Sequence, residues 1–305
     1  YVIICNLCKN TFSLKNRYKN IEFIFIDNNS FFYRLYYENF KFFKIINQKK
    51  VKLVYNFSGS VQFLHKTPQL TKFHNLLFFS KKLDSSYKLK SHCILWIKQV
   101  FFKRIMFKFM LIRSMHIEIQ SPHVNQYLSD FINTSKKTVY VKSDIDVYDS
   151  VFRAPKKYDF VKKIFFLFIV GPHFEYLHKN LLDFTNAMTS FNEKGIDFEI
   201  NITLTNEQLS KSKCWDTSLN LKTNFLGYIS DQETMSELFC DNTILISTSI
   251  IETLGLHVLE GIKNGIITIT PDEHYANTVY GGNMFRYELF NEDSLVDTIM
   301  SVINC

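Results

Sequence analysis

Short runs of β-branched and aromatic residues alternate with longer stretches of helical character along the chain. In the second half, apolar runs at 163–170, 198–204, 243–247 and 266–270 are separated by segments with helical patterning. Strands that alternate with helices favour a parallel sheet, because a crossover between parallel strands is usually made by a helix. The sequence therefore predicts an α/β fold.

The alternating pattern occurs in two series. The first contains predicted strands at 21–26, 51–57, 117–120 and 138–141, and the polar stretch 142–157 separates it from the second. A chain of 305 residues is long enough for two domains. We therefore predict two Rossmann-like α/β domains, comprising residues 1–147 and 148–305.

The charge distribution and the cysteines indicate which partners and which cellular compartment the chain is suited to. The chain has 36 Lys and Arg against 29 Asp and Glu, but the positive charge is dispersed and no recognition module is present, which disfavours nucleic acid as a partner. Of six cysteines only Cys5 and Cys8 have metal-like spacing, without a second pair. Free thiols and the lack of a long apolar run indicate a cytoplasmic protein.

The segment 95–113 is both basic and apolar. On a helical projection its charged residues spread around most of the circumference. That distribution favours a packed helix whose Lys and Arg stems cover one rim of the domain. The alternative is peripheral contact with an anionic membrane, at the inner face of which a lipid-linked acceptor would be presented.

Two glutamates eight positions apart, Glu252 and Glu260, flank the pair Gly255-Leu256. The pattern predicts a strand end, a loop and a helix start, where backbone N–H groups attract anions. Gly255 would let a phosphate approach the backbone. Glu260, about two turns after Glu252, can accept hydrogen bonds from a ribose diol. From spacing alone, an ordinary helix with surface glutamates remains the alternative.

This segment resembles the signature of family-four glycosyltransferases, which reads Pro-Ser-x-x-Glu-x-Phe-Gly-Leu-x-x-x-Glu-Ala. The matching positions are Ser249, Glu252, Gly255, Leu256 and Glu260, whereas Thr248, Leu254 and Gly261 replace Pro, Phe and Ala. The resemblance covers roughly residues 160–300. It implies two Rossmann-like domains facing across a cleft, the GT-B architecture, with a nucleotide-sugar donor on the C-terminal domain.

Two more segments of the second domain extend the resemblance. Residues 224–230 resemble the family's base-contacting loop, which makes Tyr228 a donor-binding candidate. His178-Lys179-Asn180 resembles a variant of its phosphate loop, in which Lys179 would neutralise the donor pyrophosphate as its charge develops. The arginine that usually accompanies this lysine is absent here. A solvated surface lysine is the alternative for Lys179.

The first domain matches less of the pattern. Residues 67–78 resemble the His-containing loop of polysaccharide-synthesising relatives, so His74 is a catalytic candidate beside the donor sugar, or else caps a loop. Relatives have a further strand and a Gly-rich loop before the position of Tyr1. The resemblance therefore implies an N-terminal domain without its first strand.

The resemblance implies a retaining glycosyltransferase of the polysaccharide-biosynthesis type (O-antigen or capsule), with a glycan or lipid-linked acceptor. Glu252 would contact the donor sugar's hydroxyls, and Lys179 with the Gly255 and Leu256 amides would hold the pyrophosphate. No cofactor or metal is expected, because Asp144-Ile145-Asp146, a pair of carboxylates with metal-like spacing, falls in the polar stretch between the domains. The alternatives are a catalytically inactive nucleotide-sugar-binding relative and a nucleotide-sugar epimerase.

Overall fold

The computed structural model describes residues 2–6, 17–18, 20–26, 33, 36–57, 66–89, 93–143, 155–159, 161, 163–171, 177–280 and 284–304. The chain forms two compact units. Unit 1 comprises Tyr1–Lys72, Ile105–Ile117 and Ser135–Thr138, and unit 2 comprises Phe73–Arg104, Glu118–Thr134 and Val139–Cys305. The predicted division at residues 147 and 148 lies outside the described residues and stays a prediction.

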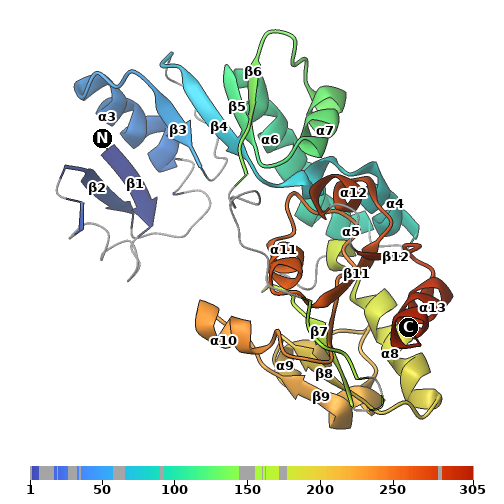
Figure 1. The fold of residues 1–305 in the computed structure, drawn as a ribbon. Coiled ribbons are helices and arrows are strands. Elements are labelled where there is room, and N and C mark those ends of the chain that lie inside the picture. Colours follow the sequence, from blue (N-terminus) through green and yellow to red (C-terminus); the bar gives the residue numbers. More distant parts are fainter. Residues whose placement is uncertain are drawn as a thin grey trace. The chain divides into compact units, whose positions relative to one another are not determined.

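Unit 2 is built around a six-stranded sheet, drawn from green to red in Figure 1. Its strands are β7 (Ile164–Phe168), β8 (Phe198–Ile202), β9 (Thr223–Phe225), β10 (Thr243–Ile246), β11 (Ile267–Pro271) and β12 (Phe285–Tyr287). All pair in parallel, in the order β12-β11-β10-β7-β8-β9. This is the doubly wound Rossmann order, whose direction of winding reverses between β7 and β10. The predicted α/β fold is confirmed.

The central strands form because their sequences are apolar on both faces. β10 is buried at all four positions, and β7 exposes none of its residues, as expected for a parallel strand covered by helices on both sides. Aromatic rings fill the core beneath β7: the Phe168 and Phe184 ring centroids lie 4.3 Å apart, and those of Phe166 and Phe191 lie 5.7 Å apart.

Helices cover this sheet. The helices of this part of the chain are α8 (Leu181–Glu193), α9 (Asn206–Ser210), α10 (Gln232–Glu237), α11 (Leu256–Lys263), α12 (His274–Tyr280) and α13 (Glu292–Ile303). The cap of α10 is Asp231, whose side chain accepts a hydrogen bond of 2.7 Å from the Thr234 N–H. A carboxylate at this position also complements the helix dipole.

Four more strands, β3 (Val54–Asn56), β4 (Gln69–Phe73), β5 (His116–Ile119) and β6 (Thr138–Val141), form a sheet in the order β3-β4-β5-β6. The sequence did not predict β4, because three of its five residues are polar. These are buried nevertheless, and Thr71 Oγ1 lies 2.6 Å from Ser114 Oγ. Buried polar side chains persist where they find such partners.

Unit 1 also contains a two-stranded parallel sheet of β1 (Val2–Asn6) and β2 (Glu22–Ile26), and the helical turns η1 (Tyr37–Lys41) and α3 (Phe42–Gln48). The sequence predicted β2 but not β1. Val2 pairs with Glu22 and Asn6 with Ile26 in the register of the sheet.

The basic, apolar segment forms one uninterrupted helix from Cys93 to Arg113. It consists of α5 (Cys93–Trp96), the π-helical turn η3 (Ile97–Phe101) and α6 (Phe102–Arg113). Arg104 holds it to α4 (Lys81–Leu89) through two 2.8 Å hydrogen bonds to the carboxylate of Asp84. None of the helices formed by the described residues is long and apolar enough to cross a membrane.

Candidate active site

A cavity of about 440 Å³ in unit 2 lies among the loops that follow β7 and β10. In open parallel sheets, ligands bind at the carboxyl ends of the strands where the winding reverses. Three of the predicted site residues, His74, Lys179 and Glu252, line it. Among the residues that the structure describes, the lining consists of His74, Asn75, Leu76, Leu77, Phe78, Lys103, Gly171, His178, Lys179, Ile251, Glu252 and Thr253.

An ion pair occupies one wall of this cavity. Lys179 Nζ lies 2.5 Å from Glu252 Oε1, which also accepts a 2.7 Å hydrogen bond from Ser249 Oγ. Burial alone would raise the pKa of Glu252, but the charge of Lys179, helped by His257 and His178, lowers it to about 2. Glu252 is therefore a carboxylate at neutral pH and a strong acceptor for substrate hydroxyls.

Hydrogen bonds to backbone carbonyls hold the segments that carry Lys179 and Glu252. The Ile250 N–H donates to the His178 carbonyl at 2.7 Å, and Thr248 Oγ1 donates to the Lys179 carbonyl at 2.8 Å. The hydroxyl of Tyr275 holds the same loop from α12, donating to the Ser249 carbonyl at 2.5 Å. The loop after β10 is thus joined directly to η4 (Leu177–Lys179), so the ion pair is preorganised rather than assembled by two mobile side chains.

His74 lies just after β4 and is joined to the glutamate loop through the backbone. Thr253 Oγ1 donates to the His74 carbonyl at 3.0 Å and accepts from the Leu76 N–H at 3.4 Å. The following turn, η2 (Leu76–Phe79), is capped by Asn75 and not by His74. The His74 side chain is solvent-exposed, as a residue that contacts a ligand in the cavity needs to be.

His123 is a residue that the sequence did not nominate. Its ring is buried at the start of α7 (His123–Phe131), with Nδ1 2.5 Å from Ser121 Oγ and Nε2 3.0 Å from the Glu252 carbonyl oxygen. A carbonyl only accepts, so Nε2 carries the proton and Nδ1 accepts from Ser121. Burial lowers the pKa of His123 to about 4, so the ring is neutral at pH 7. No local signal showed that this ring reaches a residue 129 positions later.

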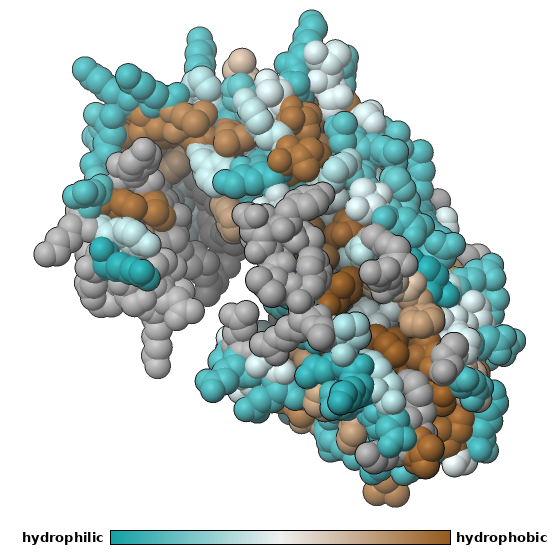
Figure 2. All heavy atoms as spheres, viewed as in Figure 1, coloured by the Kyte–Doolittle hydropathy of each residue, from teal (hydrophilic) through white to brown (hydrophobic). Residues whose placement is uncertain are grey.

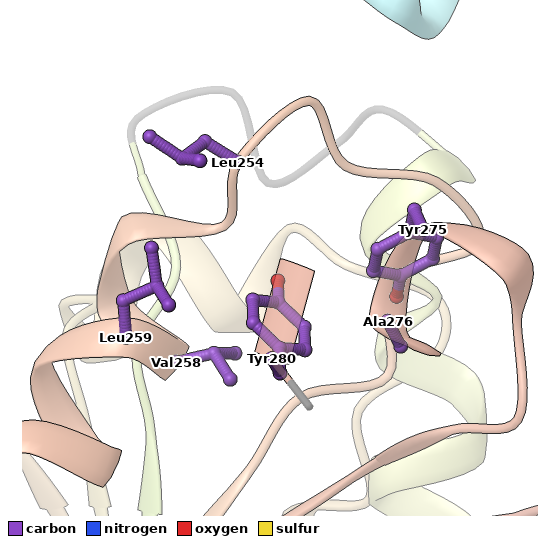
Figure 3. Packing of buried hydrophobic residues seen from close by; sticks show 6 residues of the cluster. All are labelled: Leu254, Val258, Leu259, Tyr275, Ala276 and Tyr280. Atoms are coloured by element: carbon purple, nitrogen blue, oxygen red, sulfur yellow. The ribbon is translucent and has the colours of Figure 1, made fainter. Parts of the chain in front are cut away.

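The N-terminus of α11 depends on Gly255. Its φ is +59°, and a Cβ at this position would lie 1.8 Å from the Tyr280 hydroxyl oxygen, so only glycine fits without strain. Figure 3 shows how α11 is anchored: Leu254, Val258 and Leu259 pack with residues of α12. Nearby His257 is neutral at pH 7, because burial and the charge of Lys179 lower its pKa to about 4.

Four predicted donor-binding residues do not line the cavity. Gly255 and Leu256 start α11, and Leu256 is 45% exposed. Glu260 lies one turn further on, half-buried, and burial raises its pKa. Tyr228 follows β9 and is 79% exposed. Their roles stay predictions.

A metal ion in a protein is held by several ligand side chains around one point. Within the described ranges, no group of three or more His, Cys, Asp or Glu side chains is arranged to hold a metal ion. Asp144 and Asp146 lie outside those ranges, as does Cys8. The expectation of metal-free chemistry stays a prediction.

Comparison with solved structures matches this fold to glycosyltransferases. A glycosyltransferase from Rickettsia africae ESF-5 aligns over 99% of this chain and 79% of its own, with a TM-score of 0.64 and 18% identity. WaaG, a glycosyltransferase involved in lipopolysaccharide biosynthesis, aligns over 100% and 91%, with a TM-score of 0.63 and 10% identity. The pneumococcal O-GlcNAc transferase GtfA, solved with UDP and GlcNAc, aligns over 85% and 51%, with a TM-score of 0.53 and 11% identity.

These likenesses confirm the predicted GT-B fold. No match to the sequence was found among curated proteins. The family model of glycosyl transferases group 1 matches residues 152–305, which is half of the chain and includes Lys179, Glu252 and Glu260. The chain therefore belongs to the glycosyl transferases group 1 family and is a glycosyltransferase.

Proposed function

We propose that this glycosyltransferase moves a hexosyl group, with retention of configuration, from a nucleotide diphosphate-sugar to a glycan or lipid-linked acceptor. The observation that carries the proposal is the Lys179–Glu252 pair, placed by the loops after β7 and β10 in a cavity at the reversal of the sheet. A cation for the leaving diphosphate and a carboxylate for the sugar hydroxyls are thereby side by side.

Lys179 has a charge that the reaction needs. As the bond between sugar and phosphate breaks, negative charge develops on the diphosphate, and a fixed ammonium group stabilises it more in the transition state than in the bound donor. For this to happen, Lys179 Nζ exchanges Glu252 Oε1 for a phosphate oxygen. The backbone amides at Gly255 and Leu256, at the positive end of α11, add to the same effect.

Glu252 would orient the donor sugar. Its two oxygens accept hydrogen bonds, and the low pKa means that it has no proton to lose or gain near pH 7. It therefore acts as a hydrogen-bond acceptor and electrostatic partner rather than as a general acid. His74, exposed on the cavity wall, would bind the sugar, Glu260 the ribose, and the exposed ring of Tyr228 would stack on the base.

No divalent metal is needed in this scheme. Lys179 and the helix end supply the positive charge that a metal would otherwise provide. With excess chelator, transfer should continue at the same rate; complete loss of transfer that added magnesium or manganese restores would contradict this part of the proposal.

The acceptor and pathway are proposed from the relatives. WaaG is involved in lipopolysaccharide biosynthesis, and GtfA was solved with UDP and GlcNAc. By likeness to these, we propose a role in building a bacterial surface polysaccharide such as O-antigen or capsule. The enzyme would work in the cytoplasm, at the inner face of the membrane.

A panel of nucleotide diphosphate-sugars tests the proposal. We expect one donor to release its nucleoside diphosphate in the presence of a glycan or lipid-linked acceptor, with a product whose anomeric configuration, measured by NMR, equals the donor's. Glu252→Gln should lose this activity. Glu199→Gln is the matched control, because Glu199 forms a comparable ion pair with Lys163 at the surface, at 3.2 Å. Epimerised donor without acceptor, or binding without turnover, would contradict the proposal.

A further inference from the structure

The helix from Cys93 to Arg113 exposes a row of large apolar side chains. Within α6, Phe102 is 64% exposed, Ile105 40%, Phe109 54% and Ile112 50%. Their spacing of three or four residues puts them on one face of the helix, over about 15 Å of its length. Figure 2 shows apolar residues reaching the described surface in patches, one of them where Figure 1 labels α6.

The opposite face of the same helix already has its packing partners. Val100, Met110 and Leu111 are almost completely buried. A packed helix with cations at its rim, the interpretation that the sequence favoured, accounts for these three residues. It does not account for the exposure of Phe102 and Phe109, since two phenylalanines in water gain nothing from the packing of the other face.

The charges on this helix have one sign. Between Cys93 and Arg113 there are five basic residues and no Asp or Glu. Arg104 is paired with Asp84, but Lys98 and Lys108 are exposed and lie among the apolar residues. Such a helix face, apolar and carrying only positive charge, complements a surface with an apolar interior and negatively charged groups at its boundary with water.

We propose that this face, formed by Phe102, Ile105, Phe109 and Ile112 with Lys98 and Lys108, docks on a membrane that contains anionic lipid. The phenylalanine and isoleucine side chains would enter the boundary between headgroups and acyl chains, and the lysines would contact the phosphates. A helix that lies in this interface needs no transmembrane span. We call this surface the docking face.

The docking face also suits the proposed acceptor, and this step rests on the proposed function. Lys103, the neighbour of Phe102 in the sequence, lines the candidate active-site cavity, with its Nζ 5.7 Å from the centroid of the Phe78 ring. Consecutive residues of one helix thus face a membrane and the cavity. A lipid-linked acceptor would need to travel only a short way from the bilayer to the site.

Vesicle co-sedimentation without any substrate tests the docking face. We expect the full chain to bind phosphatidylcholine vesicles with about 30% phosphatidylglycerol at least tenfold better than vesicles of phosphatidylcholine alone. About 0.5 M salt should weaken this binding, because it screens the lysines. Phe102→Ser/Phe109→Ser should reduce binding at least tenfold, and Lys98→Gln/Lys108→Gln should remove most of the preference for the anionic lipid.

The matched control is Val161→Ser/Leu221→Ser, which removes two apolar residues that are 98% and 100% exposed elsewhere in unit 2. It should bind vesicles as the wild type does. Circular dichroism confirms folding of each variant, and hydrolysis of a soluble donor should be unchanged in Phe102→Ser/Phe109→Ser. Because binding is measured without substrate, a failed donor panel leaves this test intact.

Three results would overturn the proposal. The first is equal binding of the wild type and Phe102→Ser/Phe109→Ser to anionic vesicles. The second is no binding to them by the wild type. The third is a dimer in sedimentation equilibrium that Phe102→Ser/Phe109→Ser abolishes, which would make the face a contact between two copies of the chain.

Discussion

Lys179 and Glu252, 73 positions apart in the sequence, form an ion pair at 2.5 Å whose side chains are only 17% and 15% exposed. The cation proposed to stabilise the leaving diphosphate is therefore engaged with the carboxylate proposed to hold the sugar. Removing either partner leaves a poorly hydrated charge uncompensated, which is costly in a protein interior. Variants of the two residues should consequently affect both the charge state and the activity of the site.

Lys179→Ala should lower turnover by about 10²–10³, the scale of losing one group that stabilises a developing anion. Lys179→Arg should recover part of the loss, because it keeps the charge with another geometry. Steady-state kinetics with the identified donor would show this. Lys163→Ala, which removes the lysine of the surface pair, should cost less than about threefold. Turnover of Lys179→Ala at the wild-type level would refute the assigned role.

The ion pair should also make stability depend on pH. The pKa of Glu252 falls from an ordinary 4.5 to about 2 in the folded chain, so the folded state holds the charged form more strongly than the unfolded state does. Stability from this group is complete above pH 4.5 and is lost as the pH falls towards 2. Relative to Glu252→Gln, the wild type should lose about 3 kcal/mol across that interval. Urea unfolding of both proteins at several pH values measures it, and a constant difference would contradict the low pKa.

His123→Ala should reduce turnover about tenfold although the ring is not in the cavity lining. The substitution would remove the hydrogen bond to the Glu252 carbonyl. It should lower the free energy of unfolding by about 2 kcal/mol, because a buried acceptor loses its donor. His123→Gln offers an amide donor of similar reach and should restore part of the turnover. Kinetics and urea unfolding of the two variants provide the check. Equal turnover of both variants and the wild type would show that His123 does not position Glu252.

Gly255→Ala should destabilise the fold through two separable effects. A φ of +59° costs an alanine about 1–2 kcal/mol, and the new Cβ would meet the Tyr280 hydroxyl. The double variant Gly255→Ala/Tyr280→Phe should remove the second effect and keep the first. It should therefore be more stable than the single variant Gly255→Ala. Thermal unfolding of both and of Tyr280→Phe alone gives the comparison. If the double variant is as unstable as the sum of the single changes, the hydroxyl does not cause the clash.

Glu260→Ala should raise the donor's Michaelis constant about ten- to a hundredfold with little change in turnover, because one hydrogen bond from the ribose to a charged acceptor is lost. Calorimetric titration with the donor would measure the same change in affinity. Glu233→Ala, on the exposed side of α10, serves as a control that should bind normally. Unchanged donor binding by Glu260→Ala would remove this residue from the ribose site.

The parts of the fold that follow from local patterns were predictable. β7 and β10 are short apolar runs bounded by polar residues, whereas β8 alternates apolar with polar residues. The parallel pairing of the second domain's strands then followed from the alternation of strands and helices. β4 was missed because its polar residues are buried through contacts with other strands and helices, which a local pattern does not show.

The site was predictable only as separate residues. The spacing of Glu252 and Gly255 lies within one segment, but the pairing of Lys179 with Glu252 joins loops after two different strands. The role of His123 depends on a contact across 129 positions. Such contacts arise from the packing of the whole unit, so a single sequence without the fold does not specify them.

Calorimetric titration of the donor into the wild type, Glu252→Gln and Glu199→Gln tests the central claim most directly. If the cavity between the loops after β7 and β10 is the donor site, the wild type and Glu199→Gln should bind a nucleotide diphosphate-sugar with equal affinity. Glu252→Gln should bind it at least tenfold more weakly, because a charged acceptor to the sugar hydroxyls is lost. Equal affinity of all three proteins would place the donor elsewhere and contradict the account.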